Sequence, residues 1–338
     1  MKHLKTLLLL GAAGALAAAP ASAQTKLVIG SWAPPSHHMN ADVLPTLGKR
    51  IQDATQGRVT FEIKYDLAPP QGQFEAVRDG AQDIGWIFHG FSPNKFVAAQ
   101  IMELPFLGAG AEAGSAAYWR VHEKYLAKAD EHKGVVVIGL MTHGAGVIQS
   151  LRPIKSWADL KGLKTRLPGG IASRAGETFG AVAISVPAAK LYESLSSKAV
   201  EAVFVPADAQ TSFRLAGVTK FMLRVPGNLY NGSFALVMNP KKFESLGKED
   251  QDALKSVIGE KLSAYAGSKW DAADKAGYEA AKAAGTEVSD ASPQMVEELK
   301  KVAAALEADW IKRASGKGYD PAAALKELRE TAKSLEKK

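Results

Sequence analysis

The stretch that decides the fold is DLKGLKTRLPGG, Asp159–Gly170. Within it, the segment LKTRL (163–167) places leucine, threonine and leucine on one face of a short strand. Arg166 lies on the opposite face, and Pro168 ends the strand because proline lacks the N–H that a ladder needs. The two glycines that follow permit backbone conformations that other residues resist. The stretch therefore predicts a short strand that ends in an arginine beside a rigid turn.

Strands and helices alternate on both sides of this stretch. The predicted strands are KLVIGSW (26–32), RVTFEIKYD (58–66), DIGWIFH (83–89), GVVVIGLM (134–141), AVAISV (181–186), AVEAVFV (199–205) and SFALVMN (233–239). Helical segments separate most of them, which favours mostly parallel sheets covered by helices on both faces. The pattern restarts after Gly144, and from Pro240 onward it is almost entirely helical. We therefore expect two α/β domains and a helical C-terminal region.

The N-terminus has the features of a secretory signal peptide. Two lysines precede a short apolar run, and Ala21-Ser22-Ala23 forms an A-x-A cleavage site. The run is shorter than the ~20 apolar residues of a membrane span. We assign residues 1–23 to the signal peptide and expect a soluble, exported mature chain that begins at Gln24.

Composition and motifs argue against most catalytic classes. The chain has 338 residues and no cysteine, which excludes a thiol nucleophile, a cysteine-linked lipid anchor and cysteine-ligated metal. No dinucleotide fingerprint, Walker A sequence, H-E-x-x-H or G-x-S-x-G motif occurs. The formal charge is +7, but the charges alternate in sign along predicted helices, as on solvated faces, and this disfavours nucleic-acid binding.

Two local features have alternative interpretations. The pair His37-His38 suggests metal ligation, but neighbours on a strand point to opposite faces, so a polar loop that caps the helix beginning near Ala41 is preferred to a metal site. Contact of this loop with a ligand stays open, because it follows the first strand, at whose C-terminal end ligands bind. No metal or other cofactor is therefore expected. Arg166 presents a planar fork that pairs with a carboxylate, whereas an arginine at a strand end is more often solvated or in a structural salt bridge.

Several segments resemble the DctP-type solute-binding proteins of TRAP (tripartite ATP-independent periplasmic) transporters. DLKGLKTRLPGG resembles the family motif D-[LM]-K-G-[LM]-K-x-R-[VL]-P. QFEAVRDGAQDIGWI, IMELPFLG, LRPIKSWADLKGLK and AAKLYESLSSKAVEAVF resemble other family segments in the same order and spacing. The resemblance covers the chain from about Lys26 to the C-terminal helices.

The resemblance implies a type II-like, two-domain periplasmic binding protein with a hinge and a long helix spanning both domains, near 251–284. It implies a first domain of 24–143 plus 234–270 and a second of 144–233 plus 271–338. It also implies a non-enzymatic role: an organic carboxylate is captured in the interdomain cleft, with Arg166 gripping it. The partners it implies are the small and large membrane subunits of an ion-gradient-driven transporter, with the binding protein itself a monomer.

Departures from the family pattern indicate the kind of ligand. Many members carry a second arginine before the R-P-I segment, where this chain has Gly146. The polar residues that often follow V-D-G are replaced here by Val203, Phe204 and Val205. One carboxylate grip and aromatic walls predict a monocarboxylate with an apolar or aromatic body, because a sugar acid needs many hydrogen bonds.

Eight residues are the predicted cleft contacts. They are Arg166, Trp32, Phe88, His89, His143, Phe204, Asp208 and Asn231. The two histidines can donate hydrogen bonds, and Asp208 can accept one from a ligand hydroxyl or serve as a helix N-cap. Asn231 resembles a ligand-contacting family position or is a turn residue, and Phe204 is as consistent with core as with cleft. Trp86, in the middle of its strand, is predicted to be core.

Two rival classes remain open. An ABC-type or signalling binding protein would use the same architecture for another small solute. An exported hydrolase would need a nucleophile or an acid–base pair, and the tetrad Ser245-Leu246-Gly247-Lys248 lacks the S-D-N and K-T-G partners of Ser-Lys acyl-transfer enzymes.

Overall fold

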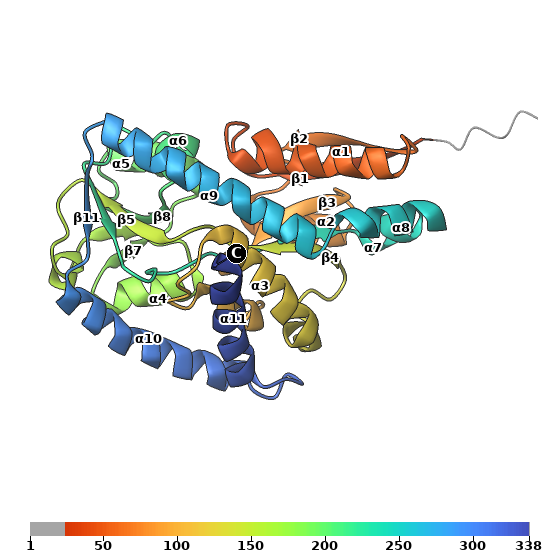
Figure 1. Cartoon of the computed structure of the whole chain (residues 1–338). Coiled ribbons are helices and arrows are strands. Elements are labelled where there is room, and N and C mark those ends of the chain that lie inside the picture. The colour runs from red at the N-terminus through yellow and green to blue at the C-terminus, as the bar shows by residue number, and fades with distance from the viewer. Residues whose placement is uncertain (1–23, 338) are drawn as a thin grey trace, which may run out of the picture.

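The computed structural model describes residues 24–337 and shows two sheets flanked by helices (Figure 1). The predicted signal peptide lies outside the described residues. The first sheet has the order β2 (Val59–Tyr65), β1 (Thr25–Ser31), β3 (Ile84–Phe88), β10 (Phe234–Met238), β4 (Val136–Met141). The second has the order β11 (Glu287–Asp290), β9 (Phe221–Arg224), β5 (Gly146–Ser150), β8 (Ala202–Pro206), β6 (Lys164–Arg166), β7 (Val182–Ile184).

Each sheet is built mainly from one continuous part of the chain: residues 25–141 with the later strand β10 form the first, and residues 146–224 with the later strand β11 form the second. In the first sheet β1, β2 and β3 are parallel, and β10 enters antiparallel between β3 and β4 after the chain has completed most of the second sheet. In the second sheet β6 pairs in parallel with both β7 and β8. The mostly parallel α/β architecture is thus confirmed, whereas the strands β5, β9 and β11 were not recognised from the sequence.

The helices lie around these sheets. They are α1 (Leu44–Ala54), α2 (Gln73–Arg78), α3 (Ala111–Lys124), α4 (Gly170–Thr178), α5 (Leu191–Ser196), α6 (Ala209–Ser212), α7 (Pro240–Glu244), α8 (Lys248–Val257), α9 (Glu260–Ala283), α10 (Pro293–Ala314) and α11 (Pro321–Glu336). None of the helices within residues 24–337 has both the length and the apolar character of a membrane span.

Three helices of the C-terminal region begin with the same local signal. Asn239, Ser292 and Asp320 each precede a proline, and each side chain accepts a backbone N–H of the first helical turn. The cap satisfies one of the donors that a helix N-terminus leaves free, and the following proline is preset for the first helical position. These short sequence patterns therefore determine where α7, α10 and α11 begin.

The long helix spans both parts of the molecule but is shorter than expected. The segment 251–284 is not one helix, because Gly259 has a positive φ of 76° and separates α8 from α9. Along α9, a Cβ on Gly267 would lie 2.2 Å from the carbonyl oxygen of Ala111 in α3. A Cβ on Gly277 would lie 2.0 Å from the carbonyl oxygen of Ala207, after β8. The two glycines let α9 pack closely against both halves (Figure 1).

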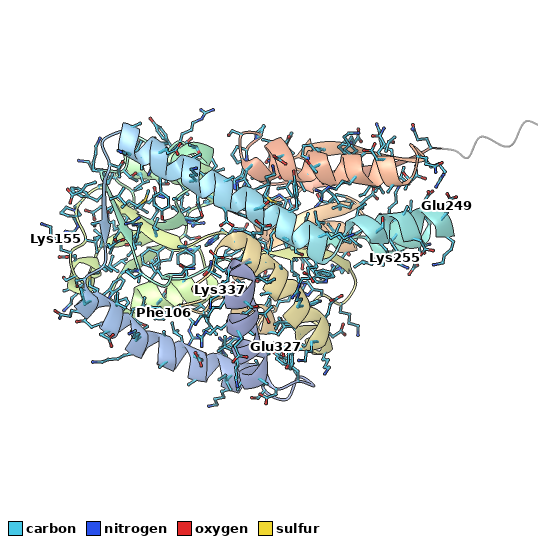
Figure 2. The ribbon with its side chains drawn as sticks, in the orientation of Figure 1. Phe106, Lys155, Glu249, Lys255, Glu327 and Lys337 are labelled. Carbon is cyan, nitrogen blue, oxygen red and sulfur yellow. The ribbon has the colours of Figure 1, made fainter. Side chains whose placement is uncertain are left out.

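The C-terminal region differs from the expectation in two respects. It contains β11, which pairs with β9 at the edge of the second sheet. Its last helix, α11, packs against α3, which covers the first sheet, although residues 271–338 were expected in the second domain. Glu327 of α11 (Figure 2) accepts hydrogen bonds from Lys124 and from Tyr125 at the end of α3. Leu325 and Leu328 of α11 belong to the same apolar cluster as Tyr118 and Val121 of α3.

Candidate functional site

A cavity lies where the two sheets face each other. Its lining comprises Trp32, His37, Trp86, Phe88, Phe91, His143, Arg166, Pro168, Ala188, Phe204, Val205, Pro206, Asp208, Phe213, Tyr230, Phe234 and Trp270. The cavity measures about 60 Å³, and a water molecule needs only about 10–15 Å³ by such a measure. It therefore has the size for a small organic molecule rather than an oligosaccharide.

Arg166 ends β6 and lines this cavity as a buried cation without an anionic partner among the residues that the structure describes. Only 5% of the residue is exposed. Its Nε donates to the carbonyl of Val186 and its Nη1 to that of Phe204, each at 3.3 Å. No carboxylate among residues 24–337 forms an ion pair with it, and burial lowers the pKa of the guanidinium. Because guanidinium has five N–H donors, most remain for an anion in the cavity.

The aromatic wall of the cavity comes mainly from the first half of the molecule. Trp32 and Trp86 stack with ring centroids 4.2 Å apart, and each indole N–H is satisfied inside the protein, by the Trp86 carbonyl and by Ser31 Oγ respectively. Phe234 packs on Phe88 at 4.9 Å and on Trp270 at 4.8 Å. The Trp32 and Trp86 indoles thus offer apolar faces without a free donor, whereas Nε1 of Trp270 is buried and has no hydrogen-bond partner within residues 24–337. The wall as a whole suits an apolar ligand body.

Tyr230 lines the cavity and explains why Gly146 replaces a larger residue. A Cβ on Gly146 would lie 2.1 Å from Cε1 of the Tyr230 ring, so this ring fills the space of a side chain at that position. Burial raises the pKa of the Tyr230 phenol above its usual value, so the hydroxyl keeps its proton. The charge of nearby Arg166 opposes part of this rise in pKa. The protonated Tyr230 hydroxyl is therefore a further hydrogen-bond donor close to the guanidinium. The sequence reasoning missed Tyr230, although it directly precedes the candidate Asn231.

Gly146→Ala is expected to lower ligand affinity by about tenfold or more, because Tyr230 would have to move. Overpacking of this kind costs about 1–3 kcal/mol. Isothermal titration calorimetry measures the affinity, and thermal unfolding measures the stability, of this variant. The control is Gly247→Ala, because a Cβ on Gly247 meets nothing within 4 Å. Equal affinities of the two variants would contradict a role for the Tyr230 ring position.

The structure places the remaining predicted residues in different roles. Phe204 and Trp32 line the cavity, and so does Trp86, which was expected only in the core. His89 does not line it, because its ring nitrogens contact Ser233 Oγ and His132 Nε2. Asn231 is also absent from the lining, since its amide donates to the carbonyls of residues 143 and 144 and so holds the crossing between the sheets.

His143 lines the cavity but is not the donor that was expected. Its Nδ1 lies 2.6 Å from the carbonyl oxygen of Gly144, and burial lowers the pKa of the ring to about 4. The neutral ring therefore carries its proton on Nδ1 and donates it to that carbonyl. Nε2 is left as an acceptor.

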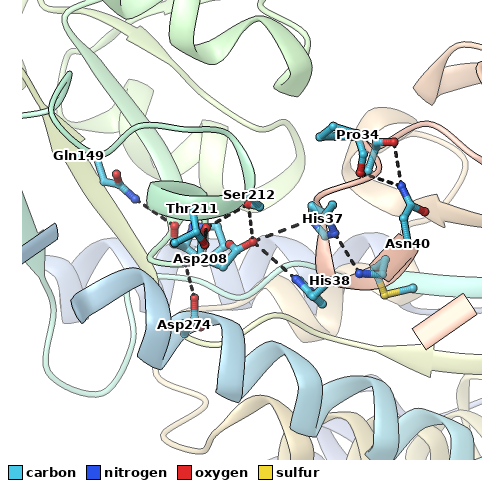
Figure 3. Close-up of polar contacts among 12 residues, drawn as sticks. Pro34, His37, His38, Asn40, Gln149, Asp208, Thr211, Ser212 and Asp274 are labelled. Atoms are coloured by element: carbon cyan, nitrogen blue, oxygen red, sulfur yellow. Dashed lines mark hydrogen bonds and ion pairs between the residues drawn. The ribbon is translucent and has the colours of Figure 1, made fainter. Parts of the chain in front are cut away.

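A polar corner of the cavity joins His37 and His38 to Asp208 (Figure 3). The Oδ2 atom of Asp208 lies 3.8 Å from His37 Nε2 and 3.8 Å from His38 Nδ1. Ser212 Oγ donates to the same carboxylate at 2.8 Å, while Asp274 Oδ1 accepts the backbone N–H of Asp208. Burial raises the pKa of Asp208 to about 7 and lowers that of His37 to about 3.

The two histidines therefore depart from the sequence interpretation. They lie in a turn before a short π-helical segment, Met39–Val43, so the argument from strand geometry does not apply. Their rings are 4.3 Å apart and approach one carboxylate. His38, at the N-cap position, makes no side-chain cap bond, whereas His37 Nδ1 accepts the backbone N–H of Met39, the first residue of that segment. Asp208 makes no side-chain cap bond to α6.

The two halves also touch at the rim of the cavity, next to Arg166. Gly169 has a φ of 106°, and a Cβ there would lie 2.2 Å from the carbonyl oxygen of Gly90, which follows β3. Glu103 Oε2 accepts the backbone N–H of Ile171 at the start of α4, at 2.9 Å. Backbone-to-backbone approach of this kind requires glycine and holds the cavity closed at this edge.

Comparison with known proteins shows extensive similarity. A model of the family DctP, described as bacterial extracellular solute-binding protein, family 7, matches residues 29–313. The outer membrane transporter protein TsaT of Comamonas testosteroni is 32% identical over 319 residues, which are 93% of this chain and 94% of that protein.

Two solved structures share the fold. A TRAP periplasmic solute-binding protein from Bordetella bronchiseptica, with bound (R)- and (S)-mandelate, has a TM-score of 0.89 and 37% identity over 92% of this chain and 99% of that one. A TRAP solute-binding protein from Rhodoferax ferrireducens, in complex with benzoate, has a TM-score of 0.86 and 26% identity over 93% and 99% of the two chains.

Proposed function

We propose a function that starts from family membership: the chain belongs to the DctP family of bacterial extracellular solute-binding proteins. It captures a small aromatic monocarboxylate in the cavity between its two sheets. The observation that carries this proposal is Arg166, a buried guanidinium with which no carboxylate of residues 24–337 forms an ion pair. Burying such a charge is costly unless it is paired, so a ligand carboxylate is the group that completes the site.

The aromatic wall of the cavity indicates the chemistry of the ligand beyond its carboxylate. Trp32, Trp86, Phe88 and Phe234 present ring faces, and aromatic rings pack favourably on such faces at 4.5–7 Å. The ligands in the two solved relatives, mandelate and benzoate, are aromatic monocarboxylates. A sugar acid or a dicarboxylate would leave polar groups unpaired against these rings.

The proposal includes export and delivery. Family membership supports an extracellular location, here the periplasm after removal of residues 1–23, and handover to the small and large membrane subunits of a TRAP transporter. Binding would close the two domains about the segments in which the chain crosses between the sheets, near 141–146 and 224–234. The protein would act as a monomer, would not bind nucleic acid and would release its ligand chemically unchanged.

A thermal-shift screen of residues 24–338 against organic acids tests this function. We expect benzoate- and phenylacetate-type acids to raise the melting temperature by several degrees, because ligand at 100 times its Kd adds ~2.7 kcal/mol. Sugar acids and C4-dicarboxylates serve as controls of equal or higher charge. Stabilisation by these controls alone, or recovery of a chemically altered ligand, would contradict the proposal.

A further inference from the structure

The polar corner of the cavity contains a donor and an acceptor that do not satisfy each other. His37 Nε2 and Asp208 Oδ2 are 3.8 Å apart, beyond hydrogen-bonding distance. No other group within residues 24–337 bonds to His37 Nε2, and both residues line the cavity. The gap is nevertheless narrow enough for one oxygen atom to lie within about 2.8 Å of both.

The position of the proton on His37 follows from its own hydrogen bond. The backbone N–H of Met39 points to His37 Nδ1 at 3.2 Å, so Nδ1 is the acceptor of the ring. Burial keeps the imidazole neutral. Its one proton therefore lies on Nε2 and points toward the gap.

The partner atom has acceptor capacity left. Asp208 Oδ2 accepts from Ser212 Oγ, and a carboxyl oxygen has a second lone pair. No lysine or arginine within residues 24–337 forms an ion pair with Asp208. An atom group that both accepts from His37 and donates to Asp208 fits this arrangement, and a hydroxyl does both.

We propose that His37 and Asp208 recognise a hydroxyl group on the aromatic body of the ligand, so that the physiological ligand is a hydroxylated aromatic monocarboxylate. This inference rests on the proposed function, because Arg166 must hold the carboxylate for the hydroxyl to reach the corner. A methoxy or carbonyl oxygen would satisfy His37 alone, and an unsubstituted ring would satisfy neither residue.

The position of His37 indicates which hydroxyl is meant. Its ring centroid lies 5.5 Å from that of Trp86 and 5.9 Å from that of Trp270, so the corner adjoins the aromatic wall on which the ligand ring would pack. Arg166, at the end of β6, forms no ion pair with Asp208 and donates instead to the carbonyls of Val186 and Phe204. We therefore expect the hydroxyl on the ring and not on the carbon next to the carboxylate.

Binding of matched ligands tests the inference by calorimetry. The probes are benzoate and phenylacetate, their 3- and 4-hydroxy and 4-methoxy derivatives, and mandelate. We expect at least one ring-hydroxylated acid to bind about tenfold or more tightly than both its parent and its methoxy derivative. The measured quantity is the preference ratio, the Kd of the parent acid divided by the Kd of its hydroxylated derivative. An effect that changes the affinity for all ligands equally cancels in this ratio.

Two variants then assign the preference to the corner. His37→Phe keeps an aromatic ring beside Trp86 and Phe213 but removes the donor, and Asp208→Leu keeps a branched side chain of similar size but removes the acceptor. Each should reduce the preference for the ring hydroxyl to about threefold or less. His122→Gln, at a histidine outside the cavity, is the control and should keep the preference. If one corner variant fails to fold, the other still decides.

The possible outcomes distinguish a failure of this inference from a failure of the proposed function. Tight binding of the parent acids without a hydroxyl preference, or a preference that survives both variants, overturns the inference alone. A preference for mandelate over phenylacetate that disappears in the variants also overturns it, because the corner would then read the nearer hydroxyl. Zinc-dependent binding abolished by a chelator would make the corner, with His38, a metal site instead. If no aromatic acid binds, the proposed function itself fails.

Discussion

Arg166→Ala is expected to lower the affinity for the preferred aromatic acid by two orders of magnitude or more. Removing one partner of a buried ion pair typically costs ~3–5 kcal/mol, because the other charge is left without a partner in a low-dielectric site. Arg166→Lys should also bind poorly, since lysine lacks the planar fork that pairs with both carboxylate oxygens. Isothermal titration calorimetry with the ligand selected by the thermal-shift screen measures both effects.

The unliganded variant provides an internal check. Because Arg166 is buried and forms no ion pair with any of residues 24–337, its removal should not lower the melting temperature of the empty protein appreciably. Arg174→Ala is the matched control: this arginine lies on the next helix, pairs with Asp309 at 2.6 Å and does not line the cavity. Affinities of the two Arg166 variants within threefold of the unmodified protein would remove Arg166 from the site.

Gly169→Ala is expected to reduce ligand affinity by about a hundredfold by preventing closure of the cavity. The added Cβ would lie 2.2 Å from the Gly90 carbonyl oxygen, and neither backbone can move without opening the contact between the two halves. The φ of 106° and ψ of −177° at Gly169 lie in a region essentially restricted to glycine, which adds a conformational cost of about 1–3 kcal/mol for alanine. Small-angle scattering should show no ligand-induced decrease in the radius of gyration.

Gly162→Ala distinguishes the conformational cost of a positive φ from the steric contact with Gly90. Gly162 also has a positive φ, 74°, but a Cβ there meets nothing within 4 Å. Both variants should lose thermal stability, Gly169→Ala more than Gly162→Ala because of its rarer backbone conformation and its contact with Gly90, whereas only Gly169→Ala should lose ligand affinity and closure. If the two variants bind ligand equally well, the approach of Gly90 to Gly169 has no role in the bound state.

The corner residues show where sequence reasoning failed on a physical ground. His37 and His38 were treated as strand neighbours, although a chain turn brings both rings to Asp208, 170 residues further along the sequence. His89 was placed in the cleft because it follows a strand, but Ser233 and His132 take both of its nitrogens. Which face a side chain takes at a strand end depends on partners that are distant in sequence.

Local sequence patterns predicted more of the fold than of the candidate site. Alternating apolar residues located β1, β2, β3 and β4, and the motif DLKGLKTRLPGG located β6 and its terminal arginine. Cap-plus-proline pairs determine three helix starts, because a cap involves only residues within one turn. The break at Gly259 was missed because helical periodicity continues on both sides of it.

The sequence by itself therefore determined the α/β class, the family and the position of Arg166 at the end of a short strand, where we propose that it grips a carboxylate. These depend on residues that are close together in the chain and on motifs in a constant order. Only the tertiary structure decided that Arg166 has no ion-pair partner within residues 24–337, that Tyr230 fills the space over Gly146, and that His37 faces Asp208 across a gap. Each of these depends on atoms brought together from distant segments, and no local periodicity encodes such a distance.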